Sequence, residues 1–228
     1  MTLRRAASII ASSNSKGAHA PVKLVLASAS PRRLQLLERV GLTPDLLNPS
    51  DIDELPHKRE TPRALSIRLA KEKAQRALEM PLVKELGPNA FVLAADTVVG
   101  LGRRILPKAE TVDQARDCLS LLSGRSHWVY SSVCLIAPGK KLSSRCVETK
   151  VRFKRLSRED LDSYIASNEW RGKAGGYAIQ GRAEAFVRLL AGSHSAVIGL
   201  PLYETVHLLE GAGYPVFHSW MTAPQSEV

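Results

Sequence analysis

The stretch AFVLAADTVVG, residues 90–100, is an almost unbroken apolar run that contains one acidic residue. Such a run is typical of a strand buried on both faces, as in a sheet covered by helices on both sides. Asp96 interrupts it, and a carboxylate in a buried strand costs free energy unless it is paired or holds a cation. The stretch therefore predicts an α/β fold and marks Asp96 as a candidate functional residue. The alternative is a structural aspartate bonded to nearby N–H groups.

The segments around this strand alternate between helix and strand patterns. Helix starts are predicted where Ser, Thr or Pro precedes an apolar periodicity, and they lie at residues 30–31, 61–62, 111, 157 and 201. Further strands are predicted at residues 23–28, 126–137, 146–156, 184–192 and 195–200. A Pro138–Gly139 turn joins two of these strands as a hairpin, and Gly41 ends the first helix. The pattern predicts an α/β protein with a mixed sheet and flanking helices, in two lobes.

Charge is concentrated at the N-terminus. The 228 residues carry a net charge of +10, and residues 1–33 contribute +6 of it because they contain six basic and no acidic side chains. The remaining +4 is too little for a basic face across the fold, and aromatic residues make up only 5% of the chain, so a nucleic-acid-binding surface is disfavoured. Residues 1–22 are interpreted as a disordered basic extension, with a transit peptide as the alternative.

Two arginines stand where a helix normally disfavours positive charge. Arg32 and Arg33 lie in the first turn of the helix predicted after Ser30 and Pro31. The unpaired N–H groups of a helix N-terminus already form an anion site, which we expect Ser30 to cap. Two arginines beside this site would repel each other when it is empty and would bind a polyanion such as a polyphosphate. Because adjacent helical residues point about 100° apart, we expect the two side chains to diverge. The alternative is a pair of solvated surface arginines.

Three further charged residues are candidates for a site. Glu54 follows a predicted strand and is a second ligand for a hard divalent ion, or else a solvated loop acid. Lys73 lies on an apolar face of a predicted helix together with small residues. The alternative to a functional role is that its apolar stem packs on this face while its ammonium reaches solvent. Lys108 has no spacing argument and is expected to be solvated. The chain lacks a P-loop, a G-x-G-x-x-G helix start and a G-x-S-x-G elbow.

Seven motifs, taken in order, resemble the Maf-type nucleoside triphosphate pyrophosphatases. They are LASASPRR, RLAKEKA, LAADTVV, LPKAE, LSGRSH, KAGGYAIQG and VIGLPL, spread between about residues 23 and 213. Two departures from the family pattern are Ala109, where Pro is usual after the lysine, and Ser131–Ser132, where Thr-Gly is usual.

The resemblance implies an elongated α/β fold with a cleft between two lobes, and metal-dependent hydrolysis of a nucleoside triphosphate to the monophosphate and pyrophosphate. It places Ser28, Arg32 and Arg33 at the triphosphate, and Lys73 and Lys108 as phosphate-binding lysines. Asp96 and Glu54 become the acidic pair for Mg²⁺ or Mn²⁺, with Asp96 as general base. Arg32, Thr97 and Gln180 match positions linked to substrate choice. The form KAGGYAIQG is similar to the branch that acts on dTTP and UTP.

The expected organisation is a pyrophosphatase domain over residues 23–213 with a C-terminal tail over residues 214–228. The expected partner is a nucleoside triphosphate, with homodimer formation left open, and neither a membrane nor nucleic acid is expected. The three cysteines lack C-x-x-C spacing, which indicates a reducing compartment and hence the cytoplasm. A non-catalytic nucleotide- or nucleic-acid-binding regulator of cell division is the alternative function.

Overall fold

The computed structural model describes residues 22–217 and 220–221. The predicted N-terminal extension lies outside the described residues except for Val22, and so does most of the predicted C-terminal tail. A mixed seven-stranded sheet runs through the molecule in the order β2–β1–β3–β6–β7–β9, with β4 paired to β3. The sheet strands are β1 (Lys23–Leu26), β2 (Leu46–Leu47), β3 (Ala90–Leu101), β4 (Arg104–Leu106), β6 (Ser126–Ala137), β7 (Lys141–Phe153) and β9 (Val187–Ala191).

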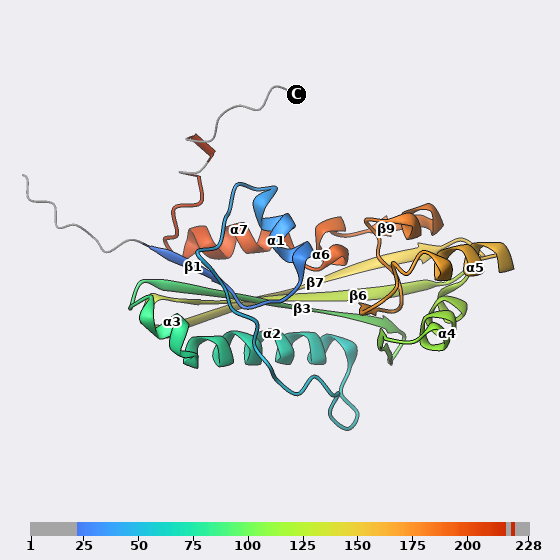
Figure 1. Ribbon diagram of the computed structural model, residues 1–228, viewed down its shortest axis with the longest axis horizontal. Coiled ribbons are helices and arrows are strands. Elements are labelled where there is room, and N and C mark those ends of the chain that lie inside the picture. The colour runs from blue at the N-terminus through green and yellow to red at the C-terminus, as the bar shows by residue number, and fades with distance from the viewer. Residues whose placement is uncertain (1–21, 218–219, 222–228) are drawn as a thin grey trace, which may run out of the picture.

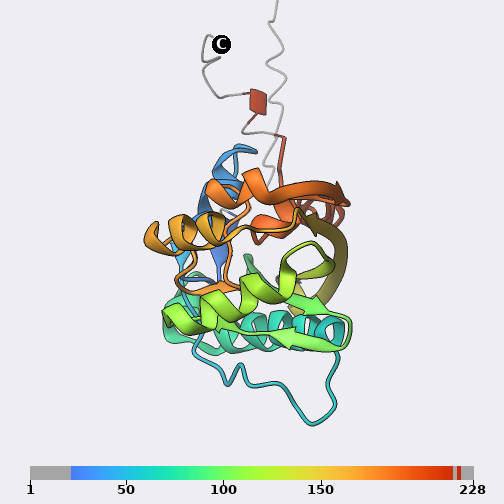
Figure 2. The same ribbon diagram turned by 90° about the vertical axis from the view of Figure 1, so that its right-hand side faces the viewer.

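Helices cover both faces of this sheet, as the buried strand predicts (Figure 1). One face carries α2 (Pro62–Glu79) and α3 (Pro81–Glu85), and the other carries α1 (Pro31–Glu38), α6 (His194–Ile198) and α7 (Leu202–Gly211). At one end lie α4 (Val112–Leu122) and α5 (Arg158–Ala166), which face the viewer in Figure 2. A small second sheet pairs β5 (Lys108–Ala109) with β8 (Lys173–Ala174). None of the described helices is both long and apolar enough to cross a bilayer.

Strand β3 contributes side chains to the apolar core on both faces of the sheet. Leu93, Ala95 and Val99 pack into the large apolar cluster on one side of the sheet. Val92 and Ala94 pack into the cluster beneath α2 on the other. Because successive side chains alternate between faces, a strand covered on both sides must be apolar at nearly every position. The expectation of an α/β fold with a mixed sheet is therefore confirmed.

The predicted helix starts at Thr61, Thr111 and Ser157 are confirmed. The Thr61 hydroxyl accepts the Ala64 N–H, and Thr111 and Ser157 each form a reciprocal capping box with the third residue of the helix. These caps satisfy N–H groups that have no partner within the helix. The signal is local, which is why the sequence alone located these starts.

Three sequence-based expectations are wrong in detail. Residues 195–200, predicted as a strand, belong mainly to α6, which Ser193 caps through the Ala196 N–H and which ends at Gly199. A short apolar run fits a buried strand and a buried helix equally well, so periodicity could not separate them. Residues 184–192 form a strand only over β9, because the 3₁₀ helix η2 (Arg182–Phe186) precedes it. Ser30 occupies the N-cap position of α1, but its side chain makes no capping bond.

Other boundaries shift by a few residues. The hairpin is confirmed, with the 3₁₀ turn η1 (Pro138–Lys140) at its tip and a second strand that begins at Lys141. Gly41 has a φ of +68°, but it lies beyond the Arg39 cap rather than directly after the last helical residue.

The sheet is interrupted beside the middle of β3. Strand β1 pairs with residues 90–93 of β3, and β4 pairs with residues 99–101 of the same edge. Among the described residues no strand pairs with the intervening positions 94–98 on that edge, whereas β6 covers the opposite edge throughout. Asp96 and Thr97 lie in this interval, next to the carboxyl end of β1. An opening at a parallel strand's carboxyl end is where α/β sheets commonly bind ligands.

Candidate active site

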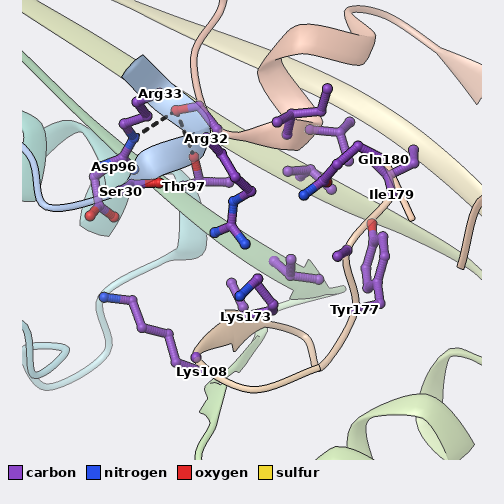
Figure 3. A pocket seen from close by; sticks show the side chains of 18 of the residues that line it. Ser30, Arg32, Arg33, Asp96, Thr97, Lys108, Lys173, Tyr177, Ile179 and Gln180 are labelled. Carbon is purple, nitrogen blue, oxygen red and sulfur yellow. Dashed lines mark hydrogen bonds between the residues drawn. The ribbon is translucent and has the colours of Figure 1, made fainter. Parts of the chain in front are cut away.

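A cleft opens above this interruption and receives side chains from elements far apart in the sequence (Figure 3). The polar and charged residues that line it are Ser30, Arg32, Arg33, Lys73, Asp96, Thr97, Lys108, Lys173, Tyr177 and Gln180. Seven of the nine residues that the sequence nominated therefore lie at one cleft, and Ser28 and Glu54 contact its lining.

At its floor, carboxylates and ammonium groups alternate. The Lys73 ammonium lies 2.6 Å from Glu54 Oε1 and 2.6 Å from Asp96 Oδ1, so it bridges the two acids. Lys108 forms an ion pair with the other oxygen of Glu54. Asp96 is 3% and Lys73 7% exposed, so their charges are compensated within the protein rather than by water. The expectation of a snorkelling Lys73 is wrong, because its ammonium is buried between two acids. The side chain of Lys108 is 47% exposed, as the expectation of a solvated lysine requires, and that of Glu54 is 37% exposed, but the two form an ion pair that the sequence did not indicate.

The electrostatics keep Glu54 ionised. Burial raises the pKa of this carboxyl, but hydrogen bonds from Lys108 and Lys73 outweigh that effect and lower the pKa to about 2. Both acids thus accept hydrogen bonds from cations in a partly dehydrated site. Charge-assisted hydrogen bonds of this kind are short and strong, which fits the 2.6 Å contacts.

The two arginines differ in what they contact. Arg33 Nε donates to the Gly199 carbonyl at 2.9 Å, and its Nη1 donates to Ser28 Oγ at 3.0 Å, so Arg33 ties α1 to the end of α6. Arg32 extends into the cleft (Figure 3), and its buried Nε has no hydrogen-bond partner among the described residues. Burial lowers the pKa of both guanidinium groups, and the Arg33 charge lowers that of Arg32 further. The buried Arg32 Nε is therefore a donor with unused capacity in the cleft.

Thr97 is hydrogen-bonded to its surroundings. The Ser131 hydroxyl donates to the Ala196 carbonyl at 2.5 Å, and Thr97 Oγ1 lies 2.9 Å from Ser131 Oγ. Since the single Ser131 proton is used on Ala196, Thr97 acts as donor to Ser131. This chain of hydroxyl groups holds α6 against β3 and β6. Thr97 thereby orients the wall of the cleft on which Gly199 lies.

The glycine-rich segment, residues 172–181, forms the opposite wall and carries Gln180 at its exposed rim. Gly175 has a φ of +68°, and a Cβ there would lie 2.9 Å from the Val99 side chain, so only glycine fits. The Ala178 N–H donates to Tyr164 Oη at 3.0 Å. Buried aromatic groups therefore fix the path of this segment.

Residue-by-residue reasoning missed two lining residues of this segment, Tyr177 and Lys173. The available signal was their place in the motif KAGGYAIQG. Tyr177 Oη lies 2.8 Å from His127 Nε2, and the Lys173 ammonium donates to the Arg171 carbonyl at 2.7 Å. Tyr177 thus connects the cleft wall to β6.

The two acids at the floor could hold a divalent ion if a bound ligand supplied the remaining oxygen atoms of its coordination shell. Glu54 Oε1 and Asp96 Oδ1 lie at equal distance from one point, which the Lys73 nitrogen occupies. No group of three or more His, Cys, Asp or Glu side chains able to hold a metal exists in the described part of the chain. Mg²⁺ is commonly bound by one or two carboxylates together with substrate phosphates, so two acids suffice only if phosphate oxygens join them.

Comparison with known proteins assigns a family. A family model described as Maf-like protein matches residues 23–212. A dTTP/UTP pyrophosphatase of Mesorhizobium japonicum is 60% identical over 88% of this chain and 97% of its own length. Those of Rhodopseudomonas palustris and Chelativorans are 59% and 58% identical, over 88% and 90% of this chain and 97% and 99% of their own. A solved Mycobacterium abscessus structure titled nucleoside-triphosphatase / dITP/XTP pyrophosphatase covers 88% of this chain and 98% of its own, with a TM-score of 0.37 and 13% identity.

Buried His127 predicts a pH dependence of stability. Burial lowers its pKa to about 4, against about 6.5 in an unfolded chain, so the unfolded state binds more protons between these values. Stability should therefore fall as the pH drops below about 6.5, by up to about 1.4 kcal/mol per pH unit. Urea unfolding at pH 7, 6 and 5 measures this. In His127→Gln, which does not titrate there, the decline should be shallower, and parallel curves for the two proteins would contradict the assignment.

Proposed function

This chain belongs to the Maf-like protein family, and on that premise we propose that it hydrolyses dTTP and UTP to the nucleoside monophosphate and pyrophosphate with a divalent metal ion. The relatives at 58–60% identity carry that activity in their names. The observation that carries the proposal is the floor of the cleft, where two ion-paired acids lie beside the unpartnered Arg32 donor.

In the proposed reaction, water attacks the α-phosphorus and pyrophosphate leaves. Asp96 orients the water and accepts its proton, while Arg32, Lys73 and Lys108 bind the phosphates of the leaving group. Positioned cations stabilise the charge that develops on the leaving oxygen without reorganisation of solvent. Mg²⁺ or Mn²⁺ held by Glu54 and Asp96 would neutralise further phosphate charge. Arg33 acts indirectly, because its hydrogen bonds to Ser28 and Gly199 hold the cleft walls in place.

Gln180 is proposed to select the base. Thymine and uracil present an N3–H donor beside a carbonyl acceptor, which match the acceptor and donor of one amide. Cytosine would match only after the amide flips, so discrimination requires neighbours that hold the orientation of the amide, and the candidates are the backbone of the GGYAIQG segment and Thr97. Gln180 is exposed in the free protein, so rejection of a mismatched edge requires that the bound nucleotide exclude water from the amide and leave its polar groups unpaired.

A nucleotide panel tests the proposed function directly. We expect rapid pyrophosphate release from dTTP and UTP and slow release from CTP and the purine triphosphates, with the monophosphate as the second product. Gln180→Ala should reduce the difference in rate between these two groups of substrates, mainly by slowing the hydrolysis of dTTP and UTP. Similar rates on all triphosphates would contradict the pyrimidine preference alone, and no pyrophosphate release from any of them would contradict the proposed function.

Asp96→Asn should lower the turnover of dTTP at least ~100-fold, since a general base typically contributes that much. A matched control is Asp45→Asn, which makes the same change at an ion pair with Lys23 outside the cleft and should keep turnover near wild type. Steady-state kinetics with both purified variants provide the measurement. Equal turnover in the two variants would remove Asp96 from the mechanism.

The arginines should lose different properties when replaced by alanine. Arg32→Ala should weaken binding of a non-hydrolysable triphosphate by about 10- to 100-fold, the worth of one charged hydrogen bond, and should leave the melting temperature near wild type. Arg33→Ala should lower the melting temperature as well, because two internal bonds are lost. Calorimetric titration and thermal melts separate these effects, with exposed Arg39→Ala as control. Equal losses of affinity and of melting temperature in the two variants would contradict the assignment of different roles to Arg32 and Arg33.

A further inference from the structure

The Lys73 ammonium occupies the point between the two acids that a metal ion would need. Its nitrogen lies 2.6 Å from one oxygen of Glu54 and 2.6 Å from one oxygen of Asp96. Carboxylate oxygens bind Mg²⁺ at about 2.1 Å, so an ion bound by these two oxygens would lie close to the position of the ammonium nitrogen. The ammonium and the ion therefore exclude each other at this point.

The charge of the free cleft also opposes a metal ion on its own. Five cationic side chains, namely Arg32, Arg33, Lys73, Lys108 and Lys173, line the cleft, against the two anions Glu54 and Asp96. The formal charge is thus +3, and a divalent ion alone would raise it to +5. Like charges repel one another more strongly in a partly dehydrated site than in water, so the free cleft disfavours the ion on its own.

The number of protein donors leads to the same conclusion. Mg²⁺ keeps near-octahedral coordination, and the described residues offer it two carboxylates here. A displaced Lys73 also needs a new anion, because it is 7% exposed and an unpaired buried ammonium is costly. A bound triphosphate, with about four negative charges, supplies both the missing oxygen ligands and a new partner for Lys73.

We propose that Lys73 holds the place of the divalent ion in the free protein, so that the ion is bound tightly only together with the nucleotide. This inference rests on the proposed function, because it takes the triphosphate as the ligand that releases Lys73. By linkage, the nucleotide and the ion strengthen each other's binding by the same factor. Lys73 then has two successive partners, the acids in the free protein and phosphate in the complex.

The affinity for Mn²⁺ tests the inference without turnover. Electron paramagnetic resonance of unbound Mn²⁺ reports binding to the full chain, with and without α,β-methylene-UTP. Wild type should bind Mn²⁺ at least ~10-fold more tightly with the analogue. Lys73→Met removes the ammonium and should bind Mn²⁺ alone at least ~10-fold more tightly than wild type. Lys84→Met removes an exposed lysine of α3 and should match wild type.

Two results would overturn the inference: tight Mn²⁺ binding by the free wild type, or no gain in affinity in a folded Lys73→Met. If Lys73→Met does not fold, Lys73→Gln makes the same comparison with a neutral side chain that still donates hydrogen bonds. The comparison of free proteins needs no nucleotide, so it decides the role of Lys73 even if the analogue fails to bind. Failure of the analogue to bind wild type would instead count against the proposed function.

Discussion

The structure depends on one buried carboxylate, Asp96, placed in the middle of a strand that is otherwise apolar. Its charge requires a partner from inside the protein, and Lys73 of α2 provides it. Small residues beside Lys73 on α2, namely Ala70, Ala74 and Ala77, let the helix approach the sheet closely. The buried bond between Ser66 and Ser132 belongs to the same close contact. Gly100 does too, because a Cβ there would lie 2.8 Å from the Pro62 ring.

The interruption of the sheet lets groups from both of its faces meet at one cleft. Lys73 approaches from the face that α2 covers, whereas Arg32 and Arg33 approach from α1 on the other face (Figure 1). A sheet paired on both edges at this point would separate the two groups by a layer of backbone. The third wall, residues 172–181, is fixed independently by Tyr164 and His127. The wall formed by α1 and the wall formed by residues 172–181 therefore have separate supports.

What the sequence predicted follows from how local each signal is. The caps at Thr61, Thr111 and Ser157 and the apolar run of β3 lie within a few residues, and these elements were placed correctly. Helix α6 was mistaken for a strand because its five residues are too few to show a period. Asp96 and Arg32 were nominated because Asp96 places a charge in an apolar strand and Arg32 places a cation in the first turn of a helix. The partners of Lys73 and the tie between Arg33 and Gly199 join distant positions, so no local pattern could reveal them.

The β6–β7 hairpin has a consequence for the order in which the molecule folds. Its strands pair without interruption from Ser126 with Arg152 to Ala137 with Lys141, across a tip of three residues. Contacts so close in sequence cost little loop entropy and can form early. The bond between Arg33 and Gly199, in contrast, closes a separation of 166 positions. The hairpin can therefore act as a template on which the cleft assembles last, and a fluctuation that detaches α6 would abolish the cleft while the hairpin stays intact.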